Sequence, residues 1–177
     1  YLLLNNGDGT VTEKLSPSAG EGSIALTTAD LDGDGDIDYA SADFITSSTI
    51  STFVNDGTGG FASSGSYSVE GVPTGVATAD WDGDGDTDLV AASQGLFLLA
   101  NQGDGTFNTA NPVASRSYSL VIALDLNGDR IPDLAAGNYE NSSVTTFLND
   151  GSADFTLLGN YAVGSSYPRL SAADLDA

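Results

Sequence analysis

The feature that most constrains the fold is a repeat of about fifty residues that runs through the chain. An aspartate-rich nonapeptide recurs, with starts at Asp30, Asp80, Asp125 and Asp174. These starts are 50, 45 and 49 residues apart. A second motif, an Asn/Gly turn followed by an apolar residue, keeps the same interval, with starts at Asn5, Asn55, Asn101 and Asn149. Two interleaved motifs with one period indicate an array of equivalent structural units.

The segments between these motifs are typical of short strands. Small, β-favouring runs precede the acidic loops, at residues 25–29, 76–79, 120–124 and 169–173. Further runs follow each loop and lead into and out of the Asn/Gly turn, which makes four strands per repeat. Four short antiparallel strands in each unit of this length are typical of a propeller blade. The sequence therefore predicts an all-β fold, a β-propeller built from four-stranded antiparallel blades, with the small residues of each first strand innermost.

We expect residues 1–177 to form a single partial β-propeller of about three and a half blades. The predicted blade boundaries are 1–22, 23–72, 73–117, 118–166 and 167–177, of which the first and last are incomplete. A solenoid is the competing architecture for repeats of this length. Solenoid repeats usually carry a helix or a leucine ladder, and neither is visible in this sequence.

Charge and composition limit the kinds of partner and of functional site that the chain can have. The chain has 25 acidic and four basic residues, a formal net charge of -21, no cysteine and no histidine. Such a surface repels nucleic acid phosphates and anionic lipid headgroups, so we expect no nucleic acid partner. Disulfides, thiolate nucleophiles, imidazole catalysis and the usual zinc sites are excluded because their residues are lacking. No apolar run approaches the length of a membrane span, so we expect no membrane insertion.

The nonapeptide has the pattern DxDxDGxxD, which places oxygen donors at side-chain positions 1, 3, 5 and 9 and at the position 7 carbonyl. Hard oxygen donors in a flexible loop suit calcium. Aspartate and glycine also form plain turns, but four carboxylates in nine residues repel one another unless a cation lies between them. The predicted calcium ligands are Asp30, Asp32, Asp34, Asp36 and Asp38 in the first loop; Asp80, Asp82, Asp84, Asp86 and Asp88 in the second; Asp125, Asn127, Asp129, Ile131 and Asp133 in the third; and Asp174 and Asp176 in the fourth.

The third loop departs from the pattern. Asn127 replaces an aspartate at position 3, and Arg130 replaces the glycine at position 6. A non-glycine residue in the left-handed region costs about 1–2 kcal/mol, and the arginine adds a positive charge, so we predict the weakest calcium site here. An EF-hand is excluded because position 12 is Ser41, Ala91 or Ala136 instead of glutamate, and because the flanking segments are strands.

With these loops and turns, the sequence resembles the FG-GAP/VCBS repeat family, the integrin α-subunit type of calcium-binding β-propeller. The resemblance covers essentially the whole chain. It implies a seven-bladed ring, calcium in the hairpin between the first two strands of a blade, and an extracellular setting. Seven such blades need roughly 340 residues. We therefore expect a fragment, with the rest of the propeller supplied by the missing chain or by another copy.

A ligand site is predicted on the face opposite the calcium hairpins. Tyrosines beside polar groups can stack on a sugar or a protein side chain, although tyrosine is also an ordinary residue of exposed loops. The candidate ligand-binding residues are Tyr118, Tyr139, Glu140, Asn141 and Tyr167. Asn141 also begins a glycosylation sequon. Trp81, at position 2 of the second loop, is expected to pack between blades.

Three functional hypotheses follow. The first is a non-catalytic, calcium-binding adhesion or recognition module whose partner is a glycan, as for a lectin, or an extracellular protein. The second is the propeller of a secreted carbohydrate-active enzyme, which needs a pair of acids outside the metal loops. Only Asp43 and Glu140 lie on the candidate face, two blades apart. The third is a structural repeat of a surface filament. We favour the first hypothesis and expect no enzyme activity.

Overall fold

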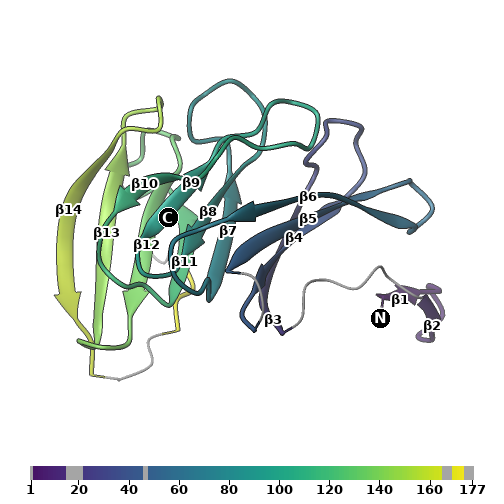
Figure 1. The fold of residues 1–177 in the computed structure, drawn as a ribbon, viewed down its shortest axis with the longest axis horizontal. Coiled ribbons are helices and arrows are strands. Elements are labelled where there is room, and N and C mark those ends of the chain that lie inside the picture. Colours follow the sequence, from purple (N-terminus) through teal and green to yellow (C-terminus); the bar gives the residue numbers. More distant parts are fainter. Residues whose placement is uncertain (1, 15–21, 46–47, 165–168, 174–177) are drawn as a thin grey trace.

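The computed structural model describes residues 2–14, 22–45, 48–164 and 169–173. Every regular element in these residues is a β-strand. The strands form three four-stranded antiparallel sheets and one two-stranded sheet, which follow one another in chain order (Figure 1). The described part of the chain has no helix of the length and apolar character needed to cross a membrane. The predicted all-β fold of four-stranded blades is confirmed.

The three complete sheets are named blades 1, 2 and 3. Blade 1 consists of β3 (Ser23–Ala29), β4 (Asp38–Asp43), β5 (Thr49–Asn55) and β6 (Phe61–Ser68). Blade 2 consists of β7 (Gly75–Ala79), β8 (Asp88–Ala92), β9 (Leu96–Leu99) and β10 (Asn111–Ala114). Blade 3 consists of β11 (Leu120–Leu124), β12 (Asp133–Asn138), β13 (Ser143–Asn149) and β14 (Phe155–Ala162). In each blade every strand pairs with the next strand along the chain.

The first strands of the blades lie innermost. β3 contacts β7, and β7 contacts β11. The inner backbones approach closely, because a Cβ atom added to Gly75 would lie 3.0 Å from the Cα atom of Leu120. The hydroxyls of Thr27 and Thr78 share a hydrogen bond of 3.1 Å between β3 and β7. Small residues such as Gly75, Thr27 and Thr78 therefore lie where the first strands of neighbouring blades approach one another.

The hydrophobic core lies between the blades. Alternate side chains of a strand point to opposite faces of its sheet, so the central strands of blade 2 pack against both neighbouring blades. Leu89 of β8 faces blade 1, and Val90 faces blade 3. All five residues of β8 are buried. Trp81 is fully buried in the cluster between blades 2 and 3, which confirms its predicted place.

The hairpin of β1 (Leu2–Asn5) and β2 (Val11–Lys14) contacts the β5–β6 turn of blade 1, where Lys14 Nζ donates to the Thr58 carbonyl at 2.8 Å. A Cβ atom on Gly59, in the β5–β6 turn, would lie 3.3 Å from Leu4. A Cβ atom on Gly105, after β9, would lie 3.3 Å from Val54 of blade 1 in the same way. Leu4 therefore meets the turn of blade 1 as Val54 meets the turn of blade 2.

One predicted strand is not formed. Residues 169–173 have no strand pairing in the structure. In the other repeats this strand pairs with the strand that follows the acidic loop, and the sequence contains no such partner for this copy.

Candidate metal centre

The acidic loops join the first and second strands of each blade. Residues at position 6 have positive φ in all three loops: Gly35 (94°), Gly85 (95°) and Arg130 (71°). Position 4 has the same conformation, at Gly33 (75°), Gly83 (78°) and Gly128 (81°). The bend at position 6 is as predicted. A glycine stands at position 4 in all three loops, so the sequence also contains a signal for this second bend.

The aspartate at position 1 folds the loop around its own carboxylate. In the first loop Asp30 Oδ1 accepts a hydrogen bond from the Gly33 amide at 2.8 Å. Asp30 Oδ2 accepts one from the Gly35 amide at 2.9 Å. Asp80 and Asp125 accept the equivalent pair of bonds in the second and third loops. Position 1 therefore sets the loop conformation.

The aspartate at position 9 is buried and ties the loop to the third strand. Asp88 is fully buried, and its Oδ2 accepts a hydrogen bond from the Trp81 amide at 3.0 Å. Its Oδ1 accepts one from the Asn101 amide at 2.8 Å. Asp38 and Asp133 are buried and bonded in the same way. The sequence pattern identified these residues as ligands but did not reveal this second role.

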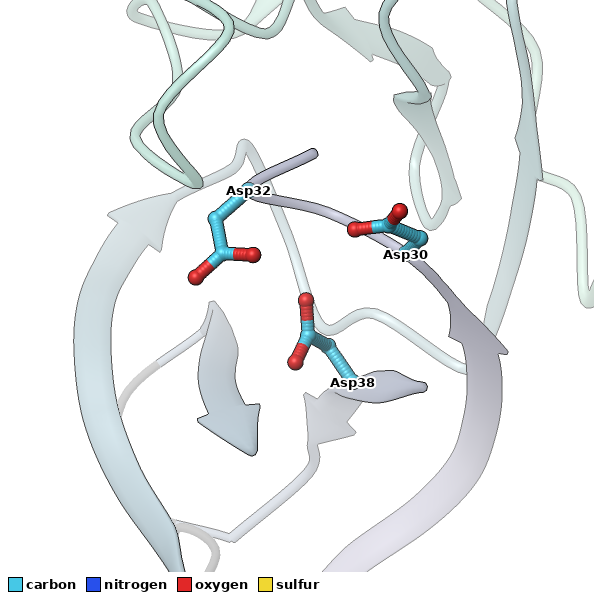
Figure 2. A group of neighbouring side chains, drawn as sticks. All are labelled: Asp30, Asp32 and Asp38. Carbon is cyan, nitrogen blue, oxygen red and sulfur yellow. The ribbon is translucent and has the colours of Figure 1, made fainter. Parts of the chain in front are cut away.

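Carboxylates converge in the first two loops. Asp30, Asp32 and Asp38 each place one carboxylate oxygen so that all three atoms lie within 4.8 Å of one another. Figure 2 shows the three side chains pointing toward a common space. Asp80, Asp82 and Asp88 form the same arrangement. Calcium–oxygen distances of about 2.3–2.6 Å let oxygens roughly 5 Å apart share one ion, so both groups fit calcium.

Electrostatics favour a cation between these carboxylates. Partial burial, together with the charges of neighbouring carboxylates, raises the pKa of Asp32 and that of Asp82. Burial is the main reason that the pKa of Asp88 is raised to about 6, against the opposing effect of its two backbone hydrogen bonds. The nearby Asp82 charge raises it further. A bound cation would stabilise the ionised form of all three groups.

Positions 5 and 7 lie outside these groups. Asp34 Oδ1 accepts a hydrogen bond from the Asp36 amide at 2.8 Å, and Asp84 bonds in the same way to Asp86. The side chain of Asp36 lies against the Asn/Gly turn, since a Cβ atom on Gly57 would meet its Oδ2 at 2.6 Å. The structure thus brings together positions 1, 3 and 9 of the predicted ligand set. The ligand roles of positions 5 and 7 stay predictions.

The third loop has the same backbone and a different set of donors. Position 3 of this loop is Asn127, so Asp125 and Asp133 lack the third carboxylate that accompanies positions 1 and 9 in the other two loops, and no group of three converging carboxylates forms here among the described residues. Asn127 Nδ2 donates to Asp129 Oδ2 at 2.8 Å, which occupies a potential ligand atom. Backbone hydrogen bonds, the Arg130 amide first, lower the pKa of Asp125. Asp174 and Asp176 of the fourth copy lie outside the described residues.

The asparagine of the second motif connects the first and second acidic loops to the blade that follows each of them. Asn101 Nδ2 donates to the Leu31 carbonyl of the first loop at 2.8 Å and to the Thr87 carbonyl at 2.8 Å. Asn149 Nδ2 donates to the Trp81 carbonyl of the second loop at 2.9 Å. Because one side chain joins both motifs across a blade boundary, the two motifs must recur with the same period.

The predicted ligand residues fall in two places. Tyr139, Glu140 and Asn141 are exposed in the β12–β13 turn, at the end of blade 3 opposite the acidic loop. Tyr118 was expected in an exposed loop, but its side chain is only 3% exposed, and its ring packs edge-to-face on Phe147. The structure corrects that expectation, because the ring belongs to the core between blades 2 and 3. Tyr167 lies outside the described residues.

The buried carboxylate of Asp43 has hydrogen-bond partners inside blade 1. Its Oδ1 accepts hydrogen bonds from the hydroxyls of Ser23 (2.7 Å) and Ser41 (3.1 Å). Its Oδ2 accepts one from Ser51 at 2.6 Å. Asp43 has no exposed surface, whereas Glu140 is exposed. These two acids, considered above as a hydrolytic pair, therefore lie in different environments.

Comparison with known proteins adds one finding. The family model of the FG-GAP-like repeat matches residues 1–41 and 30–91. The two matches together extend from β1 into β8 and cover just over half of the 177 residues. No curated protein matches the chain.

Proposed function

The chain belongs to the FG-GAP-like repeat family, and we propose from this premise that it is a calcium-binding, extracellular propeller module. Its role is non-catalytic adhesion or recognition of a glycan or an extracellular protein. The observation that carries the proposal is the pair of carboxylate groups at Asp30, Asp32 and Asp38 and at Asp80, Asp82 and Asp88. Their oxygens have the chemistry and the spacing that calcium needs.

Calcium in these loops would have a structural effect. Like charges this close destabilise a hairpin, and a divalent ion between them removes that repulsion. The position 9 aspartate bonds to the loop and to the end of the third strand, so an ion at this residue also fixes the blade. Extracellular modules commonly bind calcium with dissociation constants of about 0.1–1 mM. Such sites fill outside cells, which supports the extracellular part of the proposal.

Isothermal titration of the full chain with calcium tests the metal site. We expect at least two sites with dissociation constants of about 0.1–1 mM and weaker binding of magnesium, which prefers to keep its own waters. Asp82→Asn should remove one site. Asp8→Asn is the matched control, because Asp8 makes the same charge change in the exposed turn of the β1–β2 hairpin. Equal calcium binding by both variants would reject the loops as the metal centre.

The recognition role needs its own test. The calcium-loaded chain would be applied to a glycan array and to extracellular matrix proteins, with a chelated sample as the control. We expect retention that depends on calcium and leaves the retained glycan intact. Release of reducing sugar would instead support the enzyme hypothesis.

A further inference from the structure

One position of the outer strand differs between the blades. In blade 1 Tyr67 of β6 pairs with Ile50 of β5. The equivalent residue of blade 3 is Tyr161, which pairs with Val144. In blade 2 the residue in this position is Ala114, which pairs with Leu96. Blade 2 therefore has a methyl group where its two neighbours have a tyrosine ring.

Tyr67 shows what the tyrosine does. Its ring packs edge-to-face on Phe107 of blade 2, with 5.5 Å between the ring centres. Its hydroxyl oxygen accepts a hydrogen bond from the Phe107 amide at 3.0 Å. The tyrosine thus fills the space between blades 1 and 2 and satisfies a backbone group. Ala114 cannot do either between blades 2 and 3.

A pocket of about 290 Å³ lies beside Ala114, between blades 2 and 3. Ala114 is part of its wall, and Phe147 and Leu157 of blade 3 supply apolar surface. β10, which carries Ala114, has four residues, whereas β6 and β14 have eight each, so the outer edge of blade 2 covers less of its neighbour. The volume is at the low end for small-molecule sites and suits one sugar ring or one amino acid side chain.

The polar groups of the pocket point to an anionic ligand. Arg116, Tyr118, Thr145 and Asn160 contribute to its lining, and no aspartate or glutamate does. Arg116 is exposed and is one of four basic residues in a chain of net charge -21. Burial raises the pKa of Tyr118, while the Thr145 hydrogen bond and the Arg116 charge oppose that rise, so the guanidinium lies within electrostatic reach of the phenol.

We propose that this pocket between blades 2 and 3 binds a small ligand through a carboxylate held by Arg116. The planar guanidinium can donate two parallel hydrogen bonds to a carboxylate. The side-chain amide of Asn160, which is exposed in the pocket lining, can bond to hydroxyl or amide groups of the same ligand. The carboxylate can come from a uronic acid of a glycan or from an acidic side chain of a protein. The inference rests on the proposed recognition role, for which it names a site and a class of ligand. It does not depend on calcium binding by the acidic loops.

Binding to the full chain in 1 mM calcium would be followed by nuclear magnetic resonance. The probes are galacturonate, galactose as the neutral match, and N-acetylglutamate amide for the acidic side chain. We expect galacturonate or N-acetylglutamate amide to shift the signals of Arg116 and Asn160, and galactose to leave them unchanged. The stronger of the two acidic probes identifies the source. If neither acidic probe shifts these signals, or if galactose shifts them equally, the proposal is rejected.

Three variants, one of them a control, distinguish an effect on the pocket from an effect on the fold. Arg116→Gln should weaken binding of the acidic probe by about tenfold or more, while Arg169→Gln, the same change at an exposed residue outside the pocket, should not. Ala114→Tyr should fill the space and abolish binding. Calcium titration of each variant shows whether its acidic loops are still folded. A variant that loses carboxylate binding but keeps calcium binding has therefore lost only the pocket. Unchanged binding by Arg116→Gln would overturn the proposal.

Discussion

The second and third acidic loops have the same conformation and different ligand sets. In both, the position 1 aspartate accepts hydrogen bonds from the amides at positions 4 and 6. In both, the buried position 9 aspartate bonds to the amide at position 2 and to the end of the third strand. Yet only the second loop brings three carboxylate oxygens together within the described residues. Positions 1 and 9 therefore fold the hairpin in both loops, and the residue at position 3 decides whether three carboxylates converge.

The largest effect is expected at position 9. Asp88→Ala leaves the buried amides of Trp81 and Asn101 without partners, and each such group costs about 1–3 kcal/mol. We expect the free energy of unfolding without calcium to fall by about 3–5 kcal/mol, and Asp133→Ala to give a similar loss. Urea denaturation followed by tryptophan fluorescence measures both.

Calcium should stabilise the two variants to different extents. At a calcium concentration about thirtyfold above the dissociation constant, an intact site adds about 2 kcal/mol of stability. Asp88→Ala should lose that increment and Asp133→Ala should lose much less of it. An equal loss of the increment in both variants would contradict the proposed difference in calcium binding between the second and third loops.

The next effect concerns the connection between blades. Asn101→Ala removes a buried hydrogen bond to the Leu31 carbonyl of the first loop and a part-buried one to the Thr87 carbonyl. We expect a loss of about 2–3 kcal/mol. Asn55→Ala is the matched control. The side-chain Nδ2 of Asn55 donates to the Ile37 carbonyl of its own blade at 3.2 Å, in an exposed setting. Its loss should be about 1 kcal/mol or less.

The same pair of variants tests whether neighbouring loops are linked. Asn101→Ala should also weaken calcium binding at the first loop, because the Leu31 carbonyl that it holds belongs to that loop. Heteronuclear spectra that resolve Asp32 and Asp82 report the two loops separately. If calcium binding at the first loop is unchanged in Asn101→Ala, the asparagine has only a packing role.

The sequence predicted the parts of the structure that follow from local patterns. Strand number, blade type, the bend at position 6 and the buried Trp81 all follow from periodicity and from the conformational needs of glycine. The convergence of positions 1, 3 and 9 was included in the predicted ligand set. These features depend on residues that are close together in the chain.

The features that were missed depend on contacts between repeats. The bonds of Asn101 and Asn149 join residues about seventy positions apart, and no local pattern shows which blade an asparagine faces. The burial of Tyr118 likewise depends on blade 3 packing against blade 2. The exchange of Tyr67 for Ala114 becomes visible only when strand pairing aligns the blades. Comparing aligned repeats position by position would recover part of this information.

A smaller effect is expected when the ligand set of the third loop is repaired. Asn127→Asp replaces the amide that donates to Asp129 with a carboxylate at position 3. We expect calcium binding at the third loop to strengthen by about tenfold, because calcium affinity rises with the number of charged ligands. Asn6→Asp, in the exposed hairpin turn, is the control for charge alone. Isothermal titration should show the added site only in Asn127→Asp.

The smallest effect concerns the backbone at position 6. Arg130 has φ of 71°, where Gly85 has 95°, and a non-glycine residue in this region costs about 1–2 kcal/mol. Arg130→Gly relieves that strain but adds freedom to the unfolded chain, which offsets part of the gain. We expect a net stabilisation of about 0.5–1 kcal/mol without calcium, measured by urea denaturation. Gly85→Ala should be destabilising by about 1 kcal/mol, as the reverse change. If Arg130→Gly improves calcium binding and leaves the calcium-free stability unchanged, then the charge of Arg130, and not its strained backbone, distinguishes the third loop from the second.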